Sequence, residues 1–372
     1  MSNCNRLIIL FGLLIAAKCL AATHYVVTNG TPDVNPTDPY TNWGTAGTSI
    51  IDVVNAAMTN TEPRVVWVSN GTYYFTNGVN VTNSLTIKSV NGRSNTICVG
   101  KWLPEPVIDF YAFKIDCPAG STCGILDGFT ITNFYYSTWG QGIIRGTVAM
   151  VNRGHLLNCR IANNSMYDGG GATLGTLCKI TNCIIEENRA DRYGGGIIVH
   201  GRFVAILDTL IQNNISVAEI GGGIGMVSRT SGTISNCVII NNTAPDGGGI
   251  GSAGDYSFGI NIISCLITGN TARGYARASK TGLGGGIYLW NDHPYYGGYS
   301  TLIKDCTIQG NTAKDSGGGV YAAQCNMKNC LVYNNVAWMN VGGVLCKTGL
   351  IENCTIVSNI AGVDLQKILL EE

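Results

Sequence analysis

The stretch Ile180-Thr-Asn-Cys-Ile-Ile-Glu-Glu-Asn188 contains the pattern that decides the fold, because the same nine-residue motif occurs eight times between Leu156 and Asn359. Every copy has an apolar residue first, Asn, Asp or Ser third, Cys or Thr fourth, Ile or Val sixth, and Asn ninth. Runs of three glycines separate most copies, beginning at Gly169, Gly194, Gly221, Gly247, Gly284 and Gly317. A repeat of this kind predicts a solenoid, in which each copy stacks on the next.

The polarity pattern within each copy predicts two short strands joined by a bend. The fourth and sixth residues have the same parity, so both point to one face of a strand. The first residue is also apolar but has the opposite parity, which requires a bend before the cysteine. Asn, Asp or Ser at the third position tolerates a left-handed backbone there. We therefore expect an inner Ile ladder, an inner Cys ladder, an Asn-marked corner and then a glycine-rich strand.

The length and composition of the repeat exclude the other common solenoids. The fourth-position residues are 24 to 41 residues apart, but glycine triplets and β-branched runs argue against helical repeats. The leucine signature of leucine-rich repeats is absent. What remains is an all-β chain that forms a single parallel β-helix, with rungs about 4.8 Å apart.

We expect four segments along the chain. Residues 1–22 resemble a secretory signal peptide, with Arg6 before an apolar run and a small-residue cleavage site at Leu20-Ala-Ala22. Residues 23–150 should form an N-terminal cap and irregular first rungs, with an amphipathic helix at Ser49–Met58 closing the open end. Residues 151–361 are the regular repeats, and residues 362–372 a C-terminal tail or cap. No segment after the signal is expected to span a membrane.

Charge and cysteine content limit the possible partners. The formal net charge is zero and only 12% of residues are charged, so no nucleic-acid partner is expected. Seven of the 15 cysteines occupy the ladder position, where parallel side chains give poor disulfide geometry, and we expect most of them to be free thiols. Cys117 and Cys123 are the best disulfide candidates. No metal site and no cofactor are predicted, because the ladder faces an apolar core and no CxxC pair exists.

Two stretches of the repeat region carry a resemblance to known families. Gly247-Gly-Gly-Ile250 followed by Ile267-Thr-Gly-Asn-Thr-Ala272 resembles the repeats of chlamydial polymorphic outer-membrane proteins. The chain is equally similar to the pectin-lyase-like superfamily, including at Val66-Trp-Val-Ser-Asn-Gly-Thr-Tyr73. The resemblance implies a right-handed parallel β-helix with an N-terminal capping helix, export, and often display on a bacterial surface. It implies no single activity, since relatives include adhesins, polysaccharide lyases and glycoside hydrolases.

Interruptions of the repeat indicate the candidate functional residues, because regular rungs only stack. The largest interruptions fall between residues 252 and 300, and those that carry the candidate residues lie along one edge of the solenoid. Aromatic rings stack on sugars, and arginines bind carboxylates of acidic glycans. The predicted substrate-binding residues are Tyr256, Trp290, Tyr295, Tyr296, Arg202 and Arg229.

A catalytic interpretation of the same edge uses three further residues. Asp255 and Asp292 would form a carboxylate pair, or His293 would act as a base, while an arginine holds a uronate. The competing interpretation is that these are ordinary polar residues of solvated loops.

Two functions therefore remain open. The first is a secreted or surface-displayed adhesin-like or structural module that binds a polysaccharide or another cell-surface or host ligand. The second is a polysaccharide lyase or glycoside hydrolase. The regular ladder, the neutral charge and the lack of a compact acid–base cluster in the sequence favour the binding module. An enzyme would require Asp255, Asp292 and His293 to converge in one groove.

Overall fold

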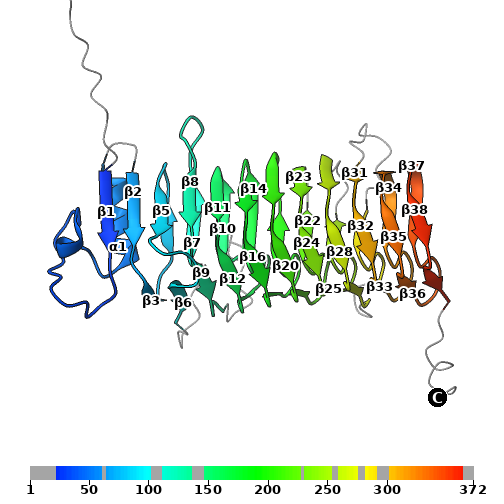
Figure 1. The fold of residues 1–372 in the computed structure, drawn as a ribbon, viewed down its shortest axis with the longest axis horizontal. Helices are drawn as coiled ribbons and strands as arrows, with labels where there is room; N and C mark the ends of the chain where they lie inside the picture. The colour runs from blue at the N-terminus through cyan, green and yellow to red at the C-terminus, as the bar shows by residue number, and fades with distance from the viewer. Residues whose placement is uncertain are drawn as a thin grey trace, which may run out of the picture.

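The computed structural model describes residues 22–60, 64–101, 111–135, 146–227, 230–253, 259–274, 281–290 and 301–362. These residues form a long rod of stacked rungs, with strands of successive rungs lying side by side along the long axis (Figure 1). The strands pair in parallel in three sheets, here called A, B and C. The predicted all-β, right-handed parallel β-helix is confirmed.

Sheet A runs the length of the rod and contributes two strands to most rungs. Its strands are β1 (Ala22–Val26), β2 (Arg64–Val68), β4 (Val79–Val81), β5 (Thr86–Ser89), β7 (Phe113–Asp116), β8 (Gly124–Asp127), β10 (Val148–Asn152), β11 (Gly154–Leu157), β14 (Ala172–Thr176), β15 (Lys179–Thr181), β18 (Ile197–Val199), β19 (Val204–Leu207), β22 (Ile224–Val227), β23 (Ser231–Ser235), β26 (Ile250–Ala253), β27 (Gly259–Ile263), β30 (Ile287–Leu289), β31 (Thr301–Lys304), β34 (Val320–Lys328) and β37 (Val344–Glu352).

Sheets B and C contribute one short strand each to a regular rung. Sheet B contains β3 (Gly71–Phe75), β6 (Thr96–Gly100), β9 (Thr130–Thr132), β12 (Arg160–Ala162), β16 (Ile184–Glu186), β20 (Leu210–Gln212), β24 (Val238–Ile240), β28 (Leu266–Thr268), β32 (Thr307–Gln309), β35 (Leu331–Tyr333) and β38 (Thr355–Val357). Sheet C contains β13 (Ser165–Met166), β17 (Arg189–Ala190), β21 (Ile215–Ser216), β25 (Thr243–Ala244), β29 (Thr271–Ala272), β33 (Thr312–Ala313), β36 (Val336–Ala337) and β39 (Ile360–Ala361).

The bend between sheets A and B lies where the sequence predicts it. The third residue of every copy has a left-handed backbone, with φ between 51° and 55°, as at Asn158, Asp208 and Ser264. The second corner differs from the prediction. It falls on the residue before the ladder asparagine, where φ is again positive, for example 55° at Asn241. The ladder asparagine therefore lies inside the turn instead of forming it.

The inner ladders fill the core of the rod. Ile211 is paired with Ile185 on one side and Ile239 on the other, and all three are fully buried. The ladder thiols donate to a carbonyl two residues earlier, as Cys183 does to Thr181 O at 3.3 Å. Thr209, the one non-cysteine at this position, makes the same bond to Leu207 O at 2.7 Å. A hydroxyl therefore replaces the thiol without leaving a polar atom unsatisfied.

The cysteines of the described residues are present as thiols, including those of the ladder. The ladder cysteines are thus free thiols in the structure, as the sequence predicts. The structure does not join Cys117 to Cys123 in the disulfide that the sequence suggested.

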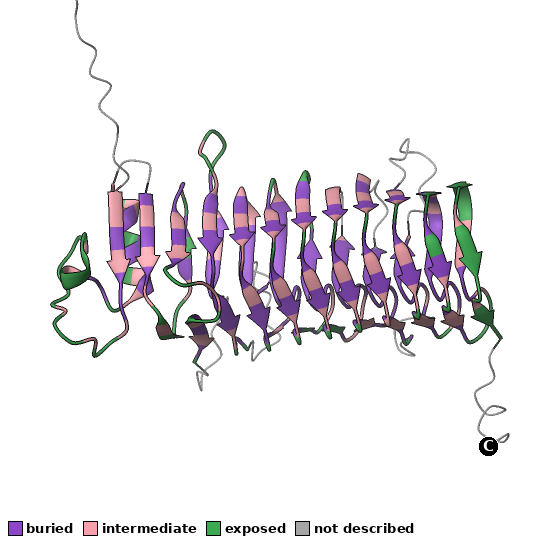
Figure 2. Cartoon of the chain, viewed as in Figure 1, coloured by how far each residue is buried: buried purple, intermediate pink, exposed green. Residues whose placement is uncertain are grey.

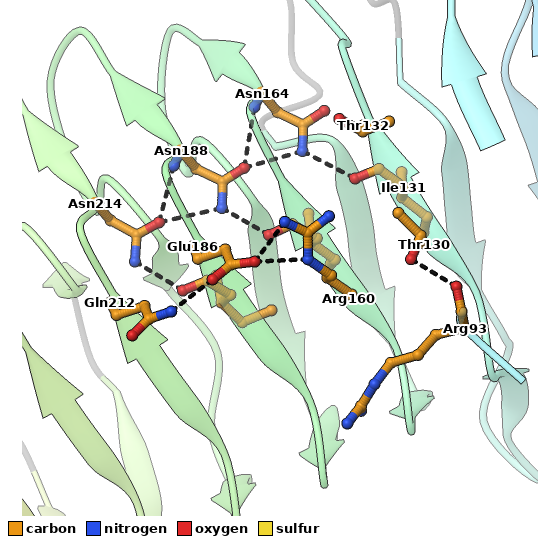
Figure 3. A network of polar contacts seen from close by, with 12 residues as sticks. Arg93, Thr130, Ile131, Thr132, Arg160, Asn164, Glu186, Asn188, Gln212 and Asn214 are labelled. Atoms are coloured by element: carbon orange, nitrogen blue, oxygen red, sulfur yellow. Dashed lines mark hydrogen bonds and ion pairs between the residues drawn. The ribbon is translucent and has the colours of Figure 1, made fainter. Parts of the chain in front are cut away.

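The asparagine ladder links successive rungs by side-chain hydrogen bonds (Figure 3). Asn188 Nδ2 donates to Asn214 Oδ1 at 3.1 Å and to Ile161 O at 2.9 Å. Its own Oδ1 accepts from the backbone N and from the Nδ2 of Asn164. Because these amides are buried, the bonds satisfy polar groups that would otherwise be costly to remove from water.

The glycine triplets form turns, which corrects the expected glycine-rich strand. A two-residue strand of sheet C follows each ladder asparagine, and the triplet then turns the chain back to sheet A. Gly221 has φ +71°, and a Cβ on Gly222 would lie 2.4 Å from Gly248 O. The second glycine is thus required because backbones of neighbouring rungs approach too closely for a side chain.

Helix α1 (Ile50–Met58) covers the N-terminal end of the core, as predicted, and a 3-10 turn (Trp43–Thr45) precedes it. The Ser49 hydroxyl caps it by accepting from Asp52 N at 3.3 Å. Its buried residues are Ile50, Val53, Val54 and Ala57, which pack toward β1, β2 and β4. At the other end, the strands of the last rung are largely exposed (Figure 2). Across the described ranges, no helix has the length and apolarity needed to cross a membrane.

Candidate functional site

The strands that precede the predicted functional loops end at one edge of sheet A. β18, β22, β26 and β30 pair in register, so their last residues lie in a row. Of the predicted site residues, Arg202 and Trp290 belong to the described residues. The other predictions lie outside them: Arg229, Asp255, Tyr256, Asp292, His293, Tyr295 and Tyr296.

Trp290 is placed on the outer face of sheet A by the alternation of β30. Ile287 and Leu289 point into the core, so Tyr288 and Trp290 point outward. The backbone N of Trp290 donates to Ser252 Oγ at 3.0 Å, which ties the end of β30 to β26. The backbone of Trp290 is therefore held by its position directly after β30 and by its hydrogen bond to the Ser252 side chain.

Three aromatic rings and one ammonium group meet at this point. The rings of Tyr288 and Trp290 are stacked, with centroids 6.4 Å apart and planes 17° apart. Tyr321, which faces Tyr288 across β30 and β34, has its ring centroid 5.8 Å from that of Tyr288. Lys347 Nζ lies 4.9 Å from the Trp290 ring centroid, a cation–π distance. We call Tyr288, Trp290, Tyr321 and Lys347 the Trp290 platform.

The residues of the platform differ in exposure, which divides their roles. Tyr288 and Tyr321 are only 7% and 9% exposed, and Ile220 packs in the same cluster. Trp290 is half-buried and Lys347 is exposed. Tyr288 therefore packs against the indole and Tyr321 packs against Tyr288, so a ligand would touch the indole and the ammonium group.

Among the four residues of the platform, Lys347 carries the charge. Burial raises the pKa of Tyr288 above its ordinary value, with added contributions from the nearby Asp246 carboxylate and from Tyr321. Tyr288 is thus a neutral phenol at neutral pH. Asp246 is itself buried and accepts from Gly282 N at 2.9 Å and Leu283 N at 2.8 Å, so its charge is held by backbone donors.

Arg202 lies in the turn between β18 and β19, away from the platform. β22 and β26 separate the strand before Arg202 from the strand before Trp290, which corresponds to roughly 14 Å along the rod at 4.8 Å per strand. Arg202 is exposed beside Phe203, whose side chain is 68% exposed. The structure therefore brings Trp290 and Arg202 to one edge without bringing them into contact.

A second group of charged and aromatic residues on the rod is occupied by its own ion pair. Arg192 donates to Asp168 at 3.1 Å from Nε and 2.7 Å from Nη2, and Asp168 is fully buried. The same guanidinium lies 4.2 Å from the Tyr167 ring centroid and 5.2 Å from that of Tyr193. Because Arg192 and Asp168 pair with each other, this cluster stabilises a turn, and we do not treat it as a ligand site.

The supporting tyrosines and Lys347 were missed in the sequence, although a signal exists. Tyr288 and Tyr321 both follow a glycine triplet and one aliphatic residue, so they occupy the same position in adjacent copies. Equal positions in a solenoid stack. In the described residues, no group of three or more His, Cys, Asp or Glu could hold a metal ion.

Comparison with known proteins gives a fold and a repeat type. Residues 305–323 match the model of the Chlamydia polymorphic membrane protein repeat. No curated protein matches the chain significantly by sequence. Among solved structures, the catalytic domain of Agl-KA is 15% identical with a TM-score of 0.50, over 82% of this chain and 61% of that one.

Two further solved structures are similar to the chain with lower TM-scores. Pectate lyase Pel9A is 15% identical over 92% of this chain and 78% of that one, with a TM-score of 0.47. Pectin methylesterase PemA from Erwinia chrysanthemi is 11% identical over 77% and 78%, with a TM-score of 0.42. At such identities the likeness concerns the fold alone. The chain thus has a right-handed parallel β-helix fold, and its residues 305–323 are similar to the Chlamydia polymorphic membrane protein repeat.

Proposed function

We propose that this chain is a secreted or surface-displayed binding module that holds a glycan on the Trp290 platform. The observation that carries the proposal is the half-exposed indole on the outer face of sheet A, which is stacked with Tyr288 and has the Lys347 ammonium group over its ring. The match to a surface-protein repeat at residues 305–323 supports display outside the cell.

The chemistry of the platform suits a sugar ring. The C–H face of a pyranose is apolar and packs on an indole face, while its hydroxyls remain at the rim where water can reach them. Lys347 adds one positive charge beside the indole, which favours a glycan that carries carboxylates. A uronate-containing polysaccharide therefore fits better than a neutral one.

The scaffold makes the platform ready for binding. Trp290 follows strand β30 directly, and its ring packs against a side chain that is buried. Fewer rotamers are lost on binding when a contact residue is already restrained, so less of the interaction energy is spent on ordering it. A rigid aromatic surface on a long rod is the arrangement expected of an adhesin-like protein.

A polysaccharide lyase or glycoside hydrolase is the second candidate, because enzymes, including a pectate lyase, are among the solved structures that are similar to this chain. Its proposed residues Asp255, Asp292 and His293 lie outside the described residues. The test of the proposal is therefore designed to detect cleavage as well as binding.

The experiment is a glycan-array screen of the purified chain, followed by mass spectrometry of every bound polysaccharide. Trp290→Ala should weaken binding about tenfold or more, because the central aromatic contact is lost. Trp43→Ala is the matched control, since Trp43 is 42% exposed at the other end of the rod. Lys347→Gln should weaken acidic glycans more than neutral ones.

Two outcomes would change the conclusion. Binding that survives Trp290→Ala unchanged would show that the platform is not the site. Shortened products that disappear in Asp292→Asn would show that the chain is an enzyme and that the platform serves as a substrate subsite.

A further inference from the structure

Two cysteines outside the Cys ladder are in contact near the C-terminal end of the rod. Cys325 lies in β34 and Cys346 in β37, and their Sγ atoms are 3.3 Å apart. A disulfide bond is about 2.0 Å long, so a movement of little more than 1 Å would join them. Cys325 is fully buried, whereas Cys346 is half-buried and can be reached from solvent.

The geometry of this pair differs from that of the ladder cysteines. Ladder cysteines occupy one position in successive rungs, so their side chains run parallel, which is poor geometry for a disulfide. Cys325 instead lies opposite Gly349, and Cys346 lies opposite Ala322. The two thiols thus approach each other diagonally across the pair of strands.

A bend in β34 brings the two thiols together. Ala322 and Cys325 are three residues apart, so in a straight strand they would point to opposite faces. Both are buried in the same core, which shows that the strand turns between them. Cys346 packs against that core beside β34, on the inner side of the bend.

We propose that Cys325 and Cys346 form a redox modification site, in which a reversible disulfide fastens β37, the last described strand of sheet A, to β34. The oxidant is a disulfide, either of low molecular weight, such as oxidised glutathione, or of a thiol-oxidising protein. Two thiols lose two protons and two electrons as their sulfurs join, and the oxidant disulfide is reduced to two thiols.

The order of the two steps follows from exposure. The thiolate of half-buried Cys346 attacks the oxidant, releases its first thiol and forms a mixed disulfide. The Cys325 sulfur then displaces the second thiol. Burial raises the pKa of the Cys325 thiol, which makes it the poorer first nucleophile and the appropriate resolving group.

The disulfide would act on the Trp290 platform through β37. That strand carries Lys347, which flanks Trp290, and Leu345, which packs in the platform cluster. Among the described strands, β37 pairs with β34 alone. A covalent bond to β34 would therefore hold Lys347 in place. Its effect on glycan binding rests on the proposed function, whereas the formation of the disulfide does not.

The test is peptide mapping of the purified full chain after equilibration in oxidised or reduced glutathione. Free thiols are blocked with iodoacetamide and the protein is digested with trypsin. Cleavage after Lys314, Lys328 and Lys347 places Cys325 in residues 315–328 and Cys346 in residues 329–347. We expect these peptides to be linked in oxidised protein, with a mass two hydrogens below their sum.

A second digestion and two variants identify the bond. Cleavage after Tyr333 or Trp338 separates Cys346 from Cys330, which lies in the same tryptic peptide. The link should be absent in Cys346→Ser and retained in the ladder variant Cys354→Ser. Oxidised wild-type protein should melt a few degrees above reduced protein, and Cys346→Ser should show no such difference.

Two outcomes would overturn the proposal. One is full alkylation of both Cys325 and Cys346 in oxidised, folded protein. The other is a link from Cys346 to a ladder cysteine in place of Cys325. Glycan affinity that falls on reduction would connect the two sites. Because the linked peptide is read without any glycan, failure of the glycan proposal leaves this result interpretable.

Discussion

The rung at Cys237–Asn242 and the rung at Cys354–Asn359 have the same repeat but different surroundings. In the interior rung, Ile239 is fully buried, whereas the equivalent Ile356 of the last rung is 41% exposed. The strand of Ile239 pairs on both sides, with β20 and β28, and the described strand of Ile356 pairs with β35.

The backbone is nevertheless the same in both rungs. The bend before the cysteine has φ 53° at Asn236 and 51° at Asn353. The second corner has φ 55° at Asn241 and 53° at Ser358. Local residue types therefore determine the shape of a rung, while the neighbouring rungs determine how much each side chain stabilises the protein.

The largest expected difference between the two rungs comes from a buried charge. Ile239→Asp would place a carboxylate in the core without a partner, and we expect it to lower the free energy of unfolding by more than about 4 kcal/mol. Ile356→Asp should lower it by less than about 1 kcal/mol, since that side chain already meets solvent. Urea unfolding followed by circular dichroism measures both. Equal losses would show that the last rung is covered in solution.

Removal of a ladder amide should have an intermediate effect. Asn242 makes four side-chain hydrogen bonds, two from Asn214 and one each to Ile211 O and Asn270 Oδ1. We expect Asn242→Ala to lower the free energy of unfolding by about 3 kcal/mol, because buried donors and acceptors are left without partners.

The matched variant in the last rung is Asn359→Ala. Asn359 accepts two bonds from Asn335, donates to Val332 O, and is only half-buried. Water can replace these partners, so the expected loss is about 1 kcal/mol. The same urea experiment compares the two, and a larger loss for Asn359 would contradict the dependence on neighbouring rungs.

Ion pairs should give the smallest difference. Glu186 accepts from Arg160 at 2.5 Å and from Gln212 at 2.6 Å on the outer face of sheet B (Figure 3). Lys328 and Glu352 at the end of the rod are 3.6 Å apart and both 47% exposed. We expect Glu186→Gln to lower the free energy of unfolding by about 1 kcal/mol and Glu352→Gln by almost nothing. Added salt should reduce the first effect, and an effect that salt leaves unchanged would show that packing, not charge, is responsible.

The bend, the inner ladders and the capping helix could be predicted because each depends on neighbouring residues. Asn, Asp or Ser before the cysteine tolerates positive φ, and parity assigns the fourth and sixth residues to one face. The apolar positions of Ser49–Met58 follow a helical period. Sheet C escaped prediction because a strand of two residues, such as Thr243–Ala244, is too short to show alternation.

The functional edge could be predicted only in part. The bulge after β30 predicted Trp290 as a binding residue, and the structure places Trp290 on the outer face of sheet A. Tyr321 is 31 residues further along the chain and supports it only because β30 and β34 are adjacent and in register. The contact of Cys325 with Cys346 likewise depends on a bend in β34 that no local pattern revealed.

By itself, the sequence determined the type of solenoid, the position of its first bend and the residues that face its core. These properties follow from the backbone preferences and polarity of residues a few positions apart, and every copy repeats them. The tertiary structure decided which equivalent residues are buried, which rings stack and which thiols touch. Those properties depend on the stacking of whole rungs, because residues more than 20 positions apart meet only when the rod has formed.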